Sequence, residues 1–453
     1  MLTQIYRFGP SRQQILKGFV VFAPEPKRVL LQALATLPGA QADIRINARE
    51  SHCVWVDTGM TWLHTAHARR ACLSQLARRV QELARHVQEA GGQLLPSAIR
   101  PTPNERWKQL VCGDQHILET IDDNEKEVYC NLIREYLPLL IALTGRTGAG
   151  PEGIEPHASR RLSDSGQHLA ARYFASVSPR HLDRVLQCLR RDEGVGRLEL
   201  LDIRPIPGND DGSGSVELRF TDAQILNSST LAHAMLYQAL LIRARRLTRN
   251  GRRVGNIPQS LIAHNRSRAI ADGLQARFED DDRGRAAKEK SKSRGRFVAA
   301  REKLLELLED LLPEFQALEA EFAEIAPLVV GAGLRLMGHA GLQNENDMLR
   351  YLHRQGKVQG AELAALMGRM ATGGVLPNED PITAINRQLF ESPYQRLRRW
   401  WTLILANPTP KRARAPERTH ARKPAPPPSR PRRGGDSDAA SPKSPGNRPG
   451  GAA

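Results

Sequence analysis

The stretch that most constrains the fold is residues 196–222, which has the pattern of two strands joined by a turn. Apolar and polar residues alternate through both halves, with Val216, Leu218 and Phe220 as the apolar members of the second half. Alternation with a period of two is typical of a strand that has one apolar and one polar face. The run Asn-Asp-Asp-Gly-Ser-Gly between the halves has the composition of a turn. The sequence therefore predicts a pair of neighbouring strands.

The polar face of this strand pair would carry four charged side chains: Asp202, Arg204, Glu217 and Arg219. Two carboxylates and two guanidinium groups on one face can hold a cation together with a carboxylate or phosphate. The alternative is a solvated face with surface ion pairs, each of which contributes little to stability. The residues alone favour the solvated face, and the binding site is the second interpretation.

The net charge of the chain is unevenly distributed. The formal charge is +17 over 453 residues, a length that allows one large domain or several smaller ones. Residues 408–453 carry 11 lysines and arginines against 3 acids and are rich in proline, glycine and serine. That composition predicts a disordered basic tail. Because much of the charge lies there, it is weak evidence for a nucleic-acid-binding fold.

The cysteines and the apolar runs indicate the compartment. The five cysteines are widely spaced and form no Cys-x-x-Cys pair, which argues against a disulfide scaffold or a zinc ribbon. The first residues contain no apolar core of the length found in signal peptides, and the longest apolar runs are too short to span a bilayer. We therefore expect a soluble cytoplasmic protein without a membrane partner.

Periodicity predicts strands and helices along the rest of the chain. The glycine-rich stretch 145–153 follows a helix and lacks a Lys-Ser/Thr ending, so it favours a helix terminator over a phosphate-binding loop. The apolar stripe of residues 304–322 favours a helix in a bundle core, with a coiled-coil partner surface as the alternative. Strands are expected at 18–23, 43–47, 52–57 and 111–121, and helices at 61–90, 122–143, 178–191, 225–247, 260–273 and through most of 297–405.

The central stretch resembles the type 2 glutamate–cysteine ligase family of carboxylate–amine ligases. The motifs that carry the resemblance are Asp202-Ile203-Arg204-Pro205 and the strand SVELRFTD at 215–222. Two further segments look similar in the same order, REYLPLLIALTGRTG at 134–148 and HNRSRAIADGLQARFEDDDRG at 264–284. The resemblance spans about residues 1–285, and three weak motifs in order are more specific than any one of them.

The resemblance implies an α+β, glutamine-synthetase-like fold, in which an antiparallel sheet with flanking helices binds ATP and magnesium. Such enzymes phosphorylate a carboxylate and then let an amine displace the phosphate. The chain would divide into a ligase-like domain at 1–285, a helical C-terminal region at 286–407 and the basic tail at 408–453. The roles implied for the matching residues are magnesium binding by Glu217 and Asp202, catalysis by Arg204 and Arg219, and nucleotide contact by His116 and Arg268.

The sequence also departs from the family pattern. The first strand, near residues 8–15, carries none of the expected metal-binding glutamates, and Trp55 stands where the second strand would have another. One histidine of the family's His-apolar-His strand is missing after His116. A magnesium site that loses its carboxylates loses affinity. Activity would therefore require other acids to take over, with Glu50, Asp57 and Glu119 as the candidates.

Two main functions follow from this pattern. The first is a divergent ATP- and magnesium-dependent ligase that joins an amino-acid-like carboxylate to an amine. The alternative is a pseudoenzyme, a non-catalytic binding or adaptor protein that acts through the helical region and the basic tail. A third, nucleic-acid binding by the tail, would show strong salt dependence. The tail predicts an anionic or protein partner, and a homo-oligomer stays open.

Overall fold

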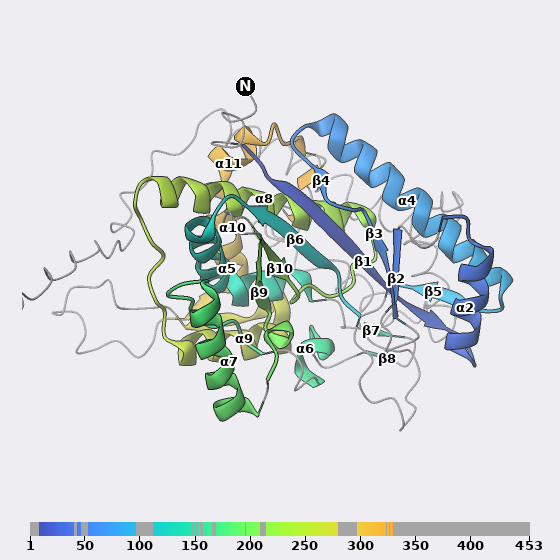
Figure 1. Cartoon of the computed structure of the whole chain (residues 1–453), viewed down its shortest axis with the longest axis horizontal. Coiled ribbons are helices and arrows are strands. Elements are labelled where there is room, and N and C mark those ends of the chain that lie inside the picture. Colours follow the sequence, from blue (N-terminus) through green and yellow to red (C-terminus); the bar gives the residue numbers. More distant parts are fainter. Residues whose placement is uncertain are drawn as a thin grey trace, which may run out of the picture. The chain divides into compact units, whose positions relative to one another are not determined.

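The main feature of the fold is an antiparallel sheet with helices packed against one face (Figure 1). The computed structural model describes residues 9–39, 43–46, 53–96, 112–145, 149–150, 153–154, 157–164, 169–194, 196–208, 214–279, 297–322, 324–325 and 327–328. The described strands form an eight-stranded sheet with the order β2-β3-β1-β6-β10-β9, and β4 and β5 also pair with β1. The predicted α+β class, an antiparallel sheet with flanking helices, is confirmed.

Strand β1 organises the sheet, because it pairs with β3, β4, β5 and β6. Nine of its eleven residues are buried, as expected for a strand with apolar residues on both sides. The strand β9 lies at one edge and contains Pro205 and Pro207. The bounds are β1 Arg12–Phe22, β2 Ile44–Ile46, β3 Cys53–Asp57, β4 Thr61–Trp62, β5 Gln93–Leu95, β6 Gln115–Thr120, β7 Ala149–Gly150, β8 Gly153–Ile154, β9 Ile203–Pro207, β10 Gly214–Leu218, β11 Arg277–Glu279 and β12 Phe297–Ala299.

Side-chain caps mark the start of two of the described helices, α4 and α5. Asp122 accepts a hydrogen bond from the backbone N–H of Glu125 at 2.8 Å, and Thr65 caps α4 in the same way at 3.1 Å from Ala68. Gly145 follows the last residue of α5 and ends it. The helices are α2 Pro26–Thr36, α4 Ala66–Glu89, α5 Asp123–Thr144, α6 Arg160–Asp164, α7 Pro179–Glu193, α8 Asn227–Arg249, α9 Gln259–Asp272, α10 Ala300–Asp310 and α11 Leu312–Ala317, with single 3₁₀ turns η2 Leu198–Leu200 and η3 Gly273–Gln275.

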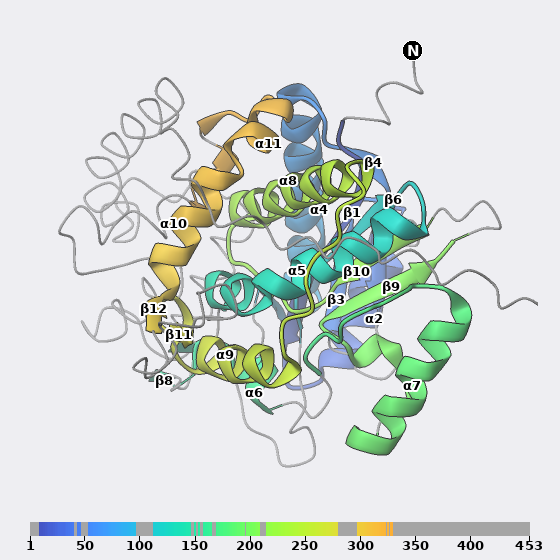
Figure 2. The ribbon, with the colours of Figure 1, turned by 90° about the vertical axis from the view of Figure 1, so that its left-hand side faces the viewer.

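The helices cover one face of the sheet, which we call the helix-covered face (Figures 1 and 2). At β1 and β3, Phe19 and Val54 pack against apolar residues of α2 and α4. At β6 and β10, Leu118 and Leu218 pack against α5, α8 and α9. Along each strand, the residues that alternate with these point to the opposite face, which we call the Glu217 face.

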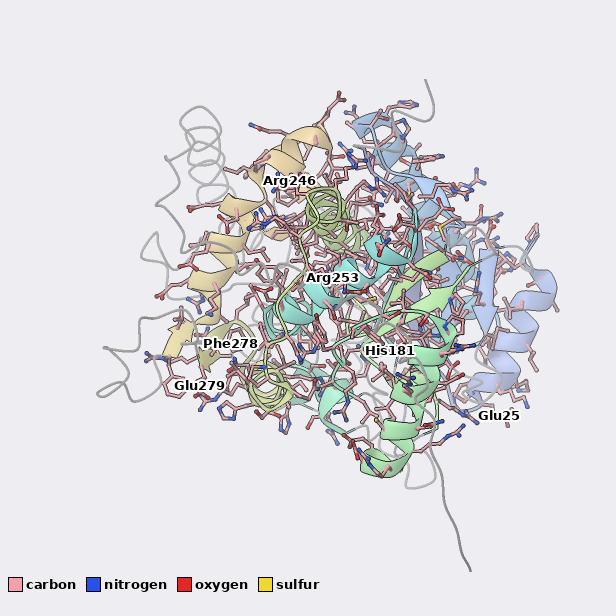
Figure 3. All side chains as sticks on the ribbon, turned by 60° about the vertical axis from the view of Figure 1, so that its left-hand side comes forward. Glu25, His181, Arg246, Arg253, Phe278 and Glu279 are labelled. Carbon is pink, nitrogen blue, oxygen red and sulfur yellow. The ribbon has the colours of Figure 1, made fainter. Side chains whose placement is uncertain are left out.

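The apolar stripe expected after residue 297 is buried against the same core. Leu304, Leu308 and Phe315 of α10 and α11 belong to the cluster that includes α5 and α8. An ion pair adds to this packing. Arg246, which Figure 3 labels on α8, lies 2.7 Å from the carboxylate of Glu314 in α11. The core-helix interpretation of the stripe is confirmed for these residues. The division at residue 285 stays a prediction, and residues 329–453, with the basic tail, lie outside the described residues.

Two further findings concern membrane-spanning helices and disulfides. None of the helices in the described ranges combines the length and the apolar character needed to cross a bilayer. All five cysteines are described, and none of them forms a disulfide, with Cys188 exposed and the other four buried.

Candidate functional site

The strand register places a row of side chains across the Glu217 face. Arg204 in β9 lies opposite Glu217 in β10, which lies opposite Ile117 in β6, which in turn lies opposite Gln14 in β1. Residues opposite one another in an antiparallel sheet share a face and lie within side-chain contact. This row defines the candidate site.

Glu217 lies between two arginines. Its side chain is buried. Its carboxylate oxygens accept hydrogen bonds from Arg204 Nη1 at 3.1 Å and from Arg219 Nη1 at 3.3 Å. The two guanidinium groups are partly accessible, at 28% and 22% of the side-chain surface. Arg204 also reaches Glu199 at 3.4 Å, but that carboxylate is exposed, so water screens its charge. The arrangement therefore has two partly exposed cations around one buried anion.

Asp202 does not join this group. Its carboxylate is completely buried and receives two hydrogen bonds from Arg266 of α9, at 2.7 and 3.1 Å. The residue lies before β9, where its N–H donates to Leu169 O instead of following the ladder. The expected grouping of four charges on one face is thus reduced to three. Sequence reasoning missed Arg266, because it stands two residues before Arg268 in the same motif and no local pattern separates the two.

His116 lies on the opposite, helix-covered face. Its ring is fully buried, 4.9 Å from the ring of Tyr237, and its Nδ1 lies 3.2 Å from Gln13 Nε2. Burial, with a smaller contribution from Lys17, lowers the pKa of His116 to about 3. The ring is therefore neutral at physiological pH. Because its neighbour Ile117 lies beside Glu217, the sheet separates His116 from the candidate site.

Arg268 contacts a different group of residues. It is partly exposed on α9, where its Nε donates to His264 Nε2 at 2.9 Å and its Nη1 to Arg277 O at 3.2 Å. Its guanidinium lies 4.8 Å from the centre of the Phe297 ring. These contacts connect α9 to the β11–β12 pair. The nucleotide roles of His116 and Arg268 stay predictions.

Two of the three substitute acids lie on the Glu217 face. Asp57 accepts two hydrogen bonds of 2.8 Å from Gln14 Nε2 and one of 2.6 Å from Arg45 Nε. Glu119 receives Arg12 Nε at 3.0 Å and Nη2 at 2.5 Å. Glu50 lies outside the described residues. Each of the two described acids is therefore already bound by a cationic or amide group of the chain.

A small apolar cluster fills the part of this face that lies over β1 and β3. Trp55 is 9% exposed, and its Nε1 donates to Gly113 O at 2.9 Å. The segment around Gly113 crosses so close to β1 that a Cβ on Gly18 would lie 2.6 Å from Cys112 Sγ. The cluster consists of Leu16, Val20, Cys53, Trp55 and Cys112, with Ile117 packed against it. Trp55, which stands where the resemblance implies a carboxylate, thus lies in a closed apolar contact.

The described residues do not fit a magnesium site. No group of three His, Cys, Asp or Glu side chains with metal-binding geometry occurs in the described ranges. Magnesium requires carboxylate oxygens that are free to enter its octahedral shell. Here the carboxylates of Glu217 and Asp202 are each held by guanidinium groups, which a magnesium ion would have to displace.

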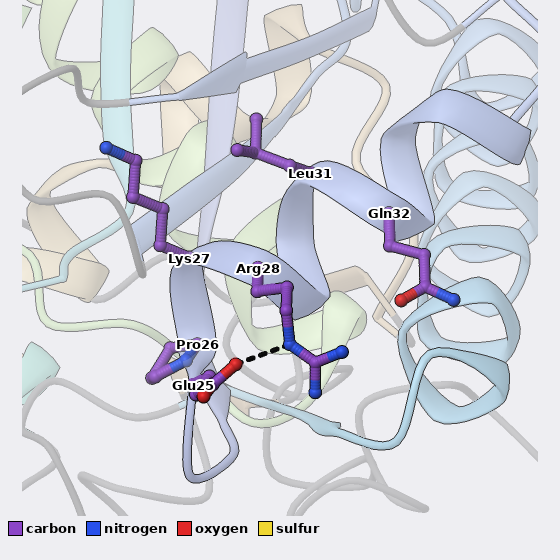
Figure 4. A pocket seen from close by; sticks show the side chains of 6 residues that line it. All are labelled: Glu25, Pro26, Lys27, Arg28, Leu31 and Gln32. Carbon is purple, nitrogen blue, oxygen red and sulfur yellow. Dashed lines mark hydrogen bonds and ion pairs between the residues drawn. The ribbon is translucent and has the colours of Figure 1, made fainter.

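A separate, shallow pocket lies on the surface of α2 and contains none of these residues (Figure 4). Its volume is about 700 Å³. Among its lining residues, Arg28 and Glu25 form an exposed ion pair at 2.5 Å. An exposed pair of this kind contributes little energy and no specific recognition. The lining residues are Glu25, Pro26, Lys27, Arg28, Leu31 and Gln32.

Comparison with known proteins gives similarity at the level of structure. No protein-family model matches the chain, and no curated protein is significantly similar in sequence. The glutamate–cysteine ligase of Francisella tularensis, in complex with AMP, aligns with 81% of this chain and 93% of its own, at 12% identity and a TM-score of 0.48. The complex between the prokaryotic ubiquitin-like protein Pup and its ligase PafA aligns with 78% of this chain and 70% of the other, at 10% identity and a TM-score of 0.47. At these values the similarity assigns no role to any residue.

Proposed function

We propose that the Glu217 face binds a small anionic molecule at Arg204 and Arg219, in a non-catalytic protein of the carboxylate–amine ligase type. The observation that carries the proposal is the pair of partly exposed guanidinium groups around one buried carboxylate, Glu217. Each guanidinium has five N–H donors, and a carboxylate or phosphate accepts two of them in parallel. Glu217 then keeps the two arginines close enough to act on one ligand.

The state of the acids supports the non-catalytic part of the proposal. Asp202, Asp57 and Glu119 are bound by Arg266, Arg45 and Arg12 respectively. A ligase of the implied type uses free carboxylates to bring magnesium to the phosphates of ATP. Carboxylates that are neutralised by arginine serve structure instead.

Titration calorimetry of the full chain with ATP, pyrophosphate and glutamate, each with and without magnesium, tests this proposal. We expect at least one anion to bind without magnesium, with affinity reduced about tenfold in Arg204→Gln and Arg219→Gln, because each loses a charged hydrogen-bond donor. Arg191→Gln is the control, since Arg191 is 76% exposed and pairs only with its neighbour Asp192 in the described contacts. An affinity that is unchanged in both site variants, or no binding at millimolar anion, would contradict the proposal.

An active ligase is the second candidate. It is favoured by the placement of Asp57 and Glu119 on the same face as Glu217. Phosphate release from ATP and magnesium, measured with pairs of amino acids, separates the two candidates. Release that depends on an amino acid and disappears in Glu217→Gln would establish the ligase and overturn the non-catalytic assignment.

The cytoplasmic location and an anionic or protein partner for the basic tail remain proposals. Their support is compositional: free cysteines and the excess of arginine and lysine after residue 408. Binding of DNA at two salt concentrations, by the full chain and by a chain that ends at residue 407, tests the nucleic-acid version of the tail partner. Equal binding by the two chains would exclude it.

A further inference from the structure

Arg219 lies one residue beyond the end of β10, where the register of the β9–β10 ladder continues through a single backbone hydrogen bond. The last ladder pair joins Leu218 to Ile203. Beyond it, the backbone of Arg219 makes two hydrogen bonds: its N–H donates to Asp202 O at 2.9 Å, and its carbonyl accepts from Arg161 Nη2 at 3.0 Å. The position of this site residue therefore depends on Asp202 and Arg161.

A buried ion pair holds each of these two partners. Arg161 of α6 donates through Nε to Asp222 Oδ1 at 2.8 Å, and the two side chains are 3% and 0% exposed. Ser159 Oγ donates to the same carboxylate oxygen at 3.0 Å. On the other side, Arg266 binds both oxygens of Asp202. Buried pairs with this many hydrogen bonds have little freedom to move.

Close packing on Gly113 fixes the guanidinium of Arg161. A Cβ on Gly113 would lie 3.0 Å from Arg161 Cζ and 2.5 Å from Thr221 O, so only glycine leaves the guanidinium room. The planar fork of arginine lets Nε and Nη2 serve two acceptors at once, whereas lysine has a single nitrogen. Arg161 thus joins Asp222 to the carbonyl of Arg219 in a way that lysine cannot reproduce.

We propose that Arg161 and Asp202 are positioning residues for Arg219: they place its guanidinium beside Glu217 for the anionic ligand. This inference rests on the proposed function and adds two residues to it. Asp202, which the family resemblance implies as a metal ligand, acts here through its backbone carbonyl while Arg266 holds its side chain.

A double-mutant cycle tests the coupling between Arg161 and Arg219. In the full chain, Arg161→Lys should weaken binding of the anion found by calorimetry about tenfold, and the same change in an Arg219→Gln background should weaken it no further. A merely structural role would weaken binding equally in both backgrounds, and that result would overturn the proposal. Arg191→Lys is the matched control and should leave affinity unchanged.

A second measurement needs no ligand. In the described structure the Nε of Arg219 is buried and has no hydrogen-bond partner. NMR on protein labelled with ¹⁵N at arginine Nε, with the signal assigned through Arg219→Lys, reports how fast this N–H exchanges with water. We expect exchange about tenfold faster in Arg161→Lys, because the freed backbone exposes the group.

The two measurements separate the two claims. Unchanged exchange of the Arg219 N–H in Arg161→Lys would overturn the positioning role, whatever the binding data show. Faster exchange in a protein that binds none of the anions would leave the positioning intact and overturn the proposed function.

Discussion

The guanidinium of Arg266 donates to both carboxylate oxygens of Asp202, at 2.7 and 3.1 Å, and Asp202 has no exposed surface. We expect Arg266→Ala to lower the free energy of unfolding by about 3–5 kcal/mol, because it leaves a buried carboxylate without its partner. Urea denaturation measures the loss. The control is Arg268→Ala, two residues along α9, where the side chain is partly exposed and the expected loss is about 1 kcal/mol or less.

The charge of Asp202 is the cause of this loss. Adding Asp202→Asn to Arg266→Ala should therefore recover part of the stability, since the amide is far less costly to bury than an unpaired carboxylate. If the double variant is less stable than Arg266→Ala by the full cost of Asp202→Asn alone, the two side chains act independently and the assignment of the pair is wrong.

Gly18 allows the segment around Cys112 to cross β1. We expect Gly18→Ala to destabilise the protein by about 1–3 kcal/mol, because the new Cβ would overlap Cys112 Sγ and the Gly113 backbone, which cannot both move away. Thermal unfolding followed by circular dichroism checks this. Gly255→Ala is the matched control, since a Cβ there meets no atom within 4 Å, and its effect should stay within about 1 kcal/mol. Equal losses of stability in the two variants would show that the segment at Cys112 and Gly113 does not pack tightly against Gly18.

The buried ring of His116 predicts a dependence of stability on pH. Burial lowers its folded-state pKa to about 3, whereas the unfolded chain has the ordinary value of about 6.5. Between these values the unfolded state binds the extra proton, so stability is complete above pH 6.5 and falls as the pH drops towards 3. From pH 7 to pH 5 this histidine should contribute a loss of about 2 kcal/mol.

Urea denaturation of the wild type and of His116→Gln at both pH values isolates this contribution. The variant is expected to be less stable at pH 7, because glutamine fills the space beside Tyr237 poorly, but to lose about 2 kcal/mol less on going to pH 5. Parallel pH profiles of the two proteins would mean that His116 accepts a proton in the folded state.

Arg69 connects the start of α4 to the chain after α11. It is fully buried, binds both oxygens of Glu324 at 2.6 and 2.8 Å, and donates to the carbonyls of Leu63, Leu318 and Glu319. We expect Arg69→Met to cost about 3–5 kcal/mol and to accelerate amide hydrogen exchange in α11 more than in β1. Mass spectrometry of deuterium uptake measures both regions in one sample.

Arg70 gives the matched comparison on the neighbouring position. Its side chain is 65% exposed and lies 3.6 Å from Glu321, so Arg70→Met should cost less than about 1 kcal/mol. Uptake in α11 that rises equally in both variants would show that Arg69 has no special part in holding this segment.

Local patterns in the sequence predicted most elements of the sheet and its helices. Alternation predicted the pair β9–β10, although residues 198–200 form a 3₁₀ turn and β9 begins only at Ile203. The pair Asp122-Asp123 marked the start of α5, because a helix cap is decided by adjacent residues. The helix expected from residue 61 begins at Ala66 instead. Thr61 and Trp62 pair with β1, about 50 residues earlier, and no local pattern contains that contact.

Local patterns also predicted part of the candidate site. Period-two alternation correctly put Arg204 and Glu217 on one face. Asp202 fits the same alternation in the sequence, but its side chain binds Arg266, which is 64 residues away. Only the packing of α9 determines this contact. The side on which His116 lies follows from alternation along β6 only once the face covered by helices is known.

The prolines of β9 have a consequence for how copies of the protein meet. Pro205 and Pro207 have no N–H, so two of the five residues of this edge strand cannot donate a hydrogen bond to a strand from another molecule. At the opposite edge, β2 is three residues long. In the described part of the chain, both ends of the main sheet are therefore poor templates for added strands, which protects an antiparallel sheet from edge-to-edge aggregation.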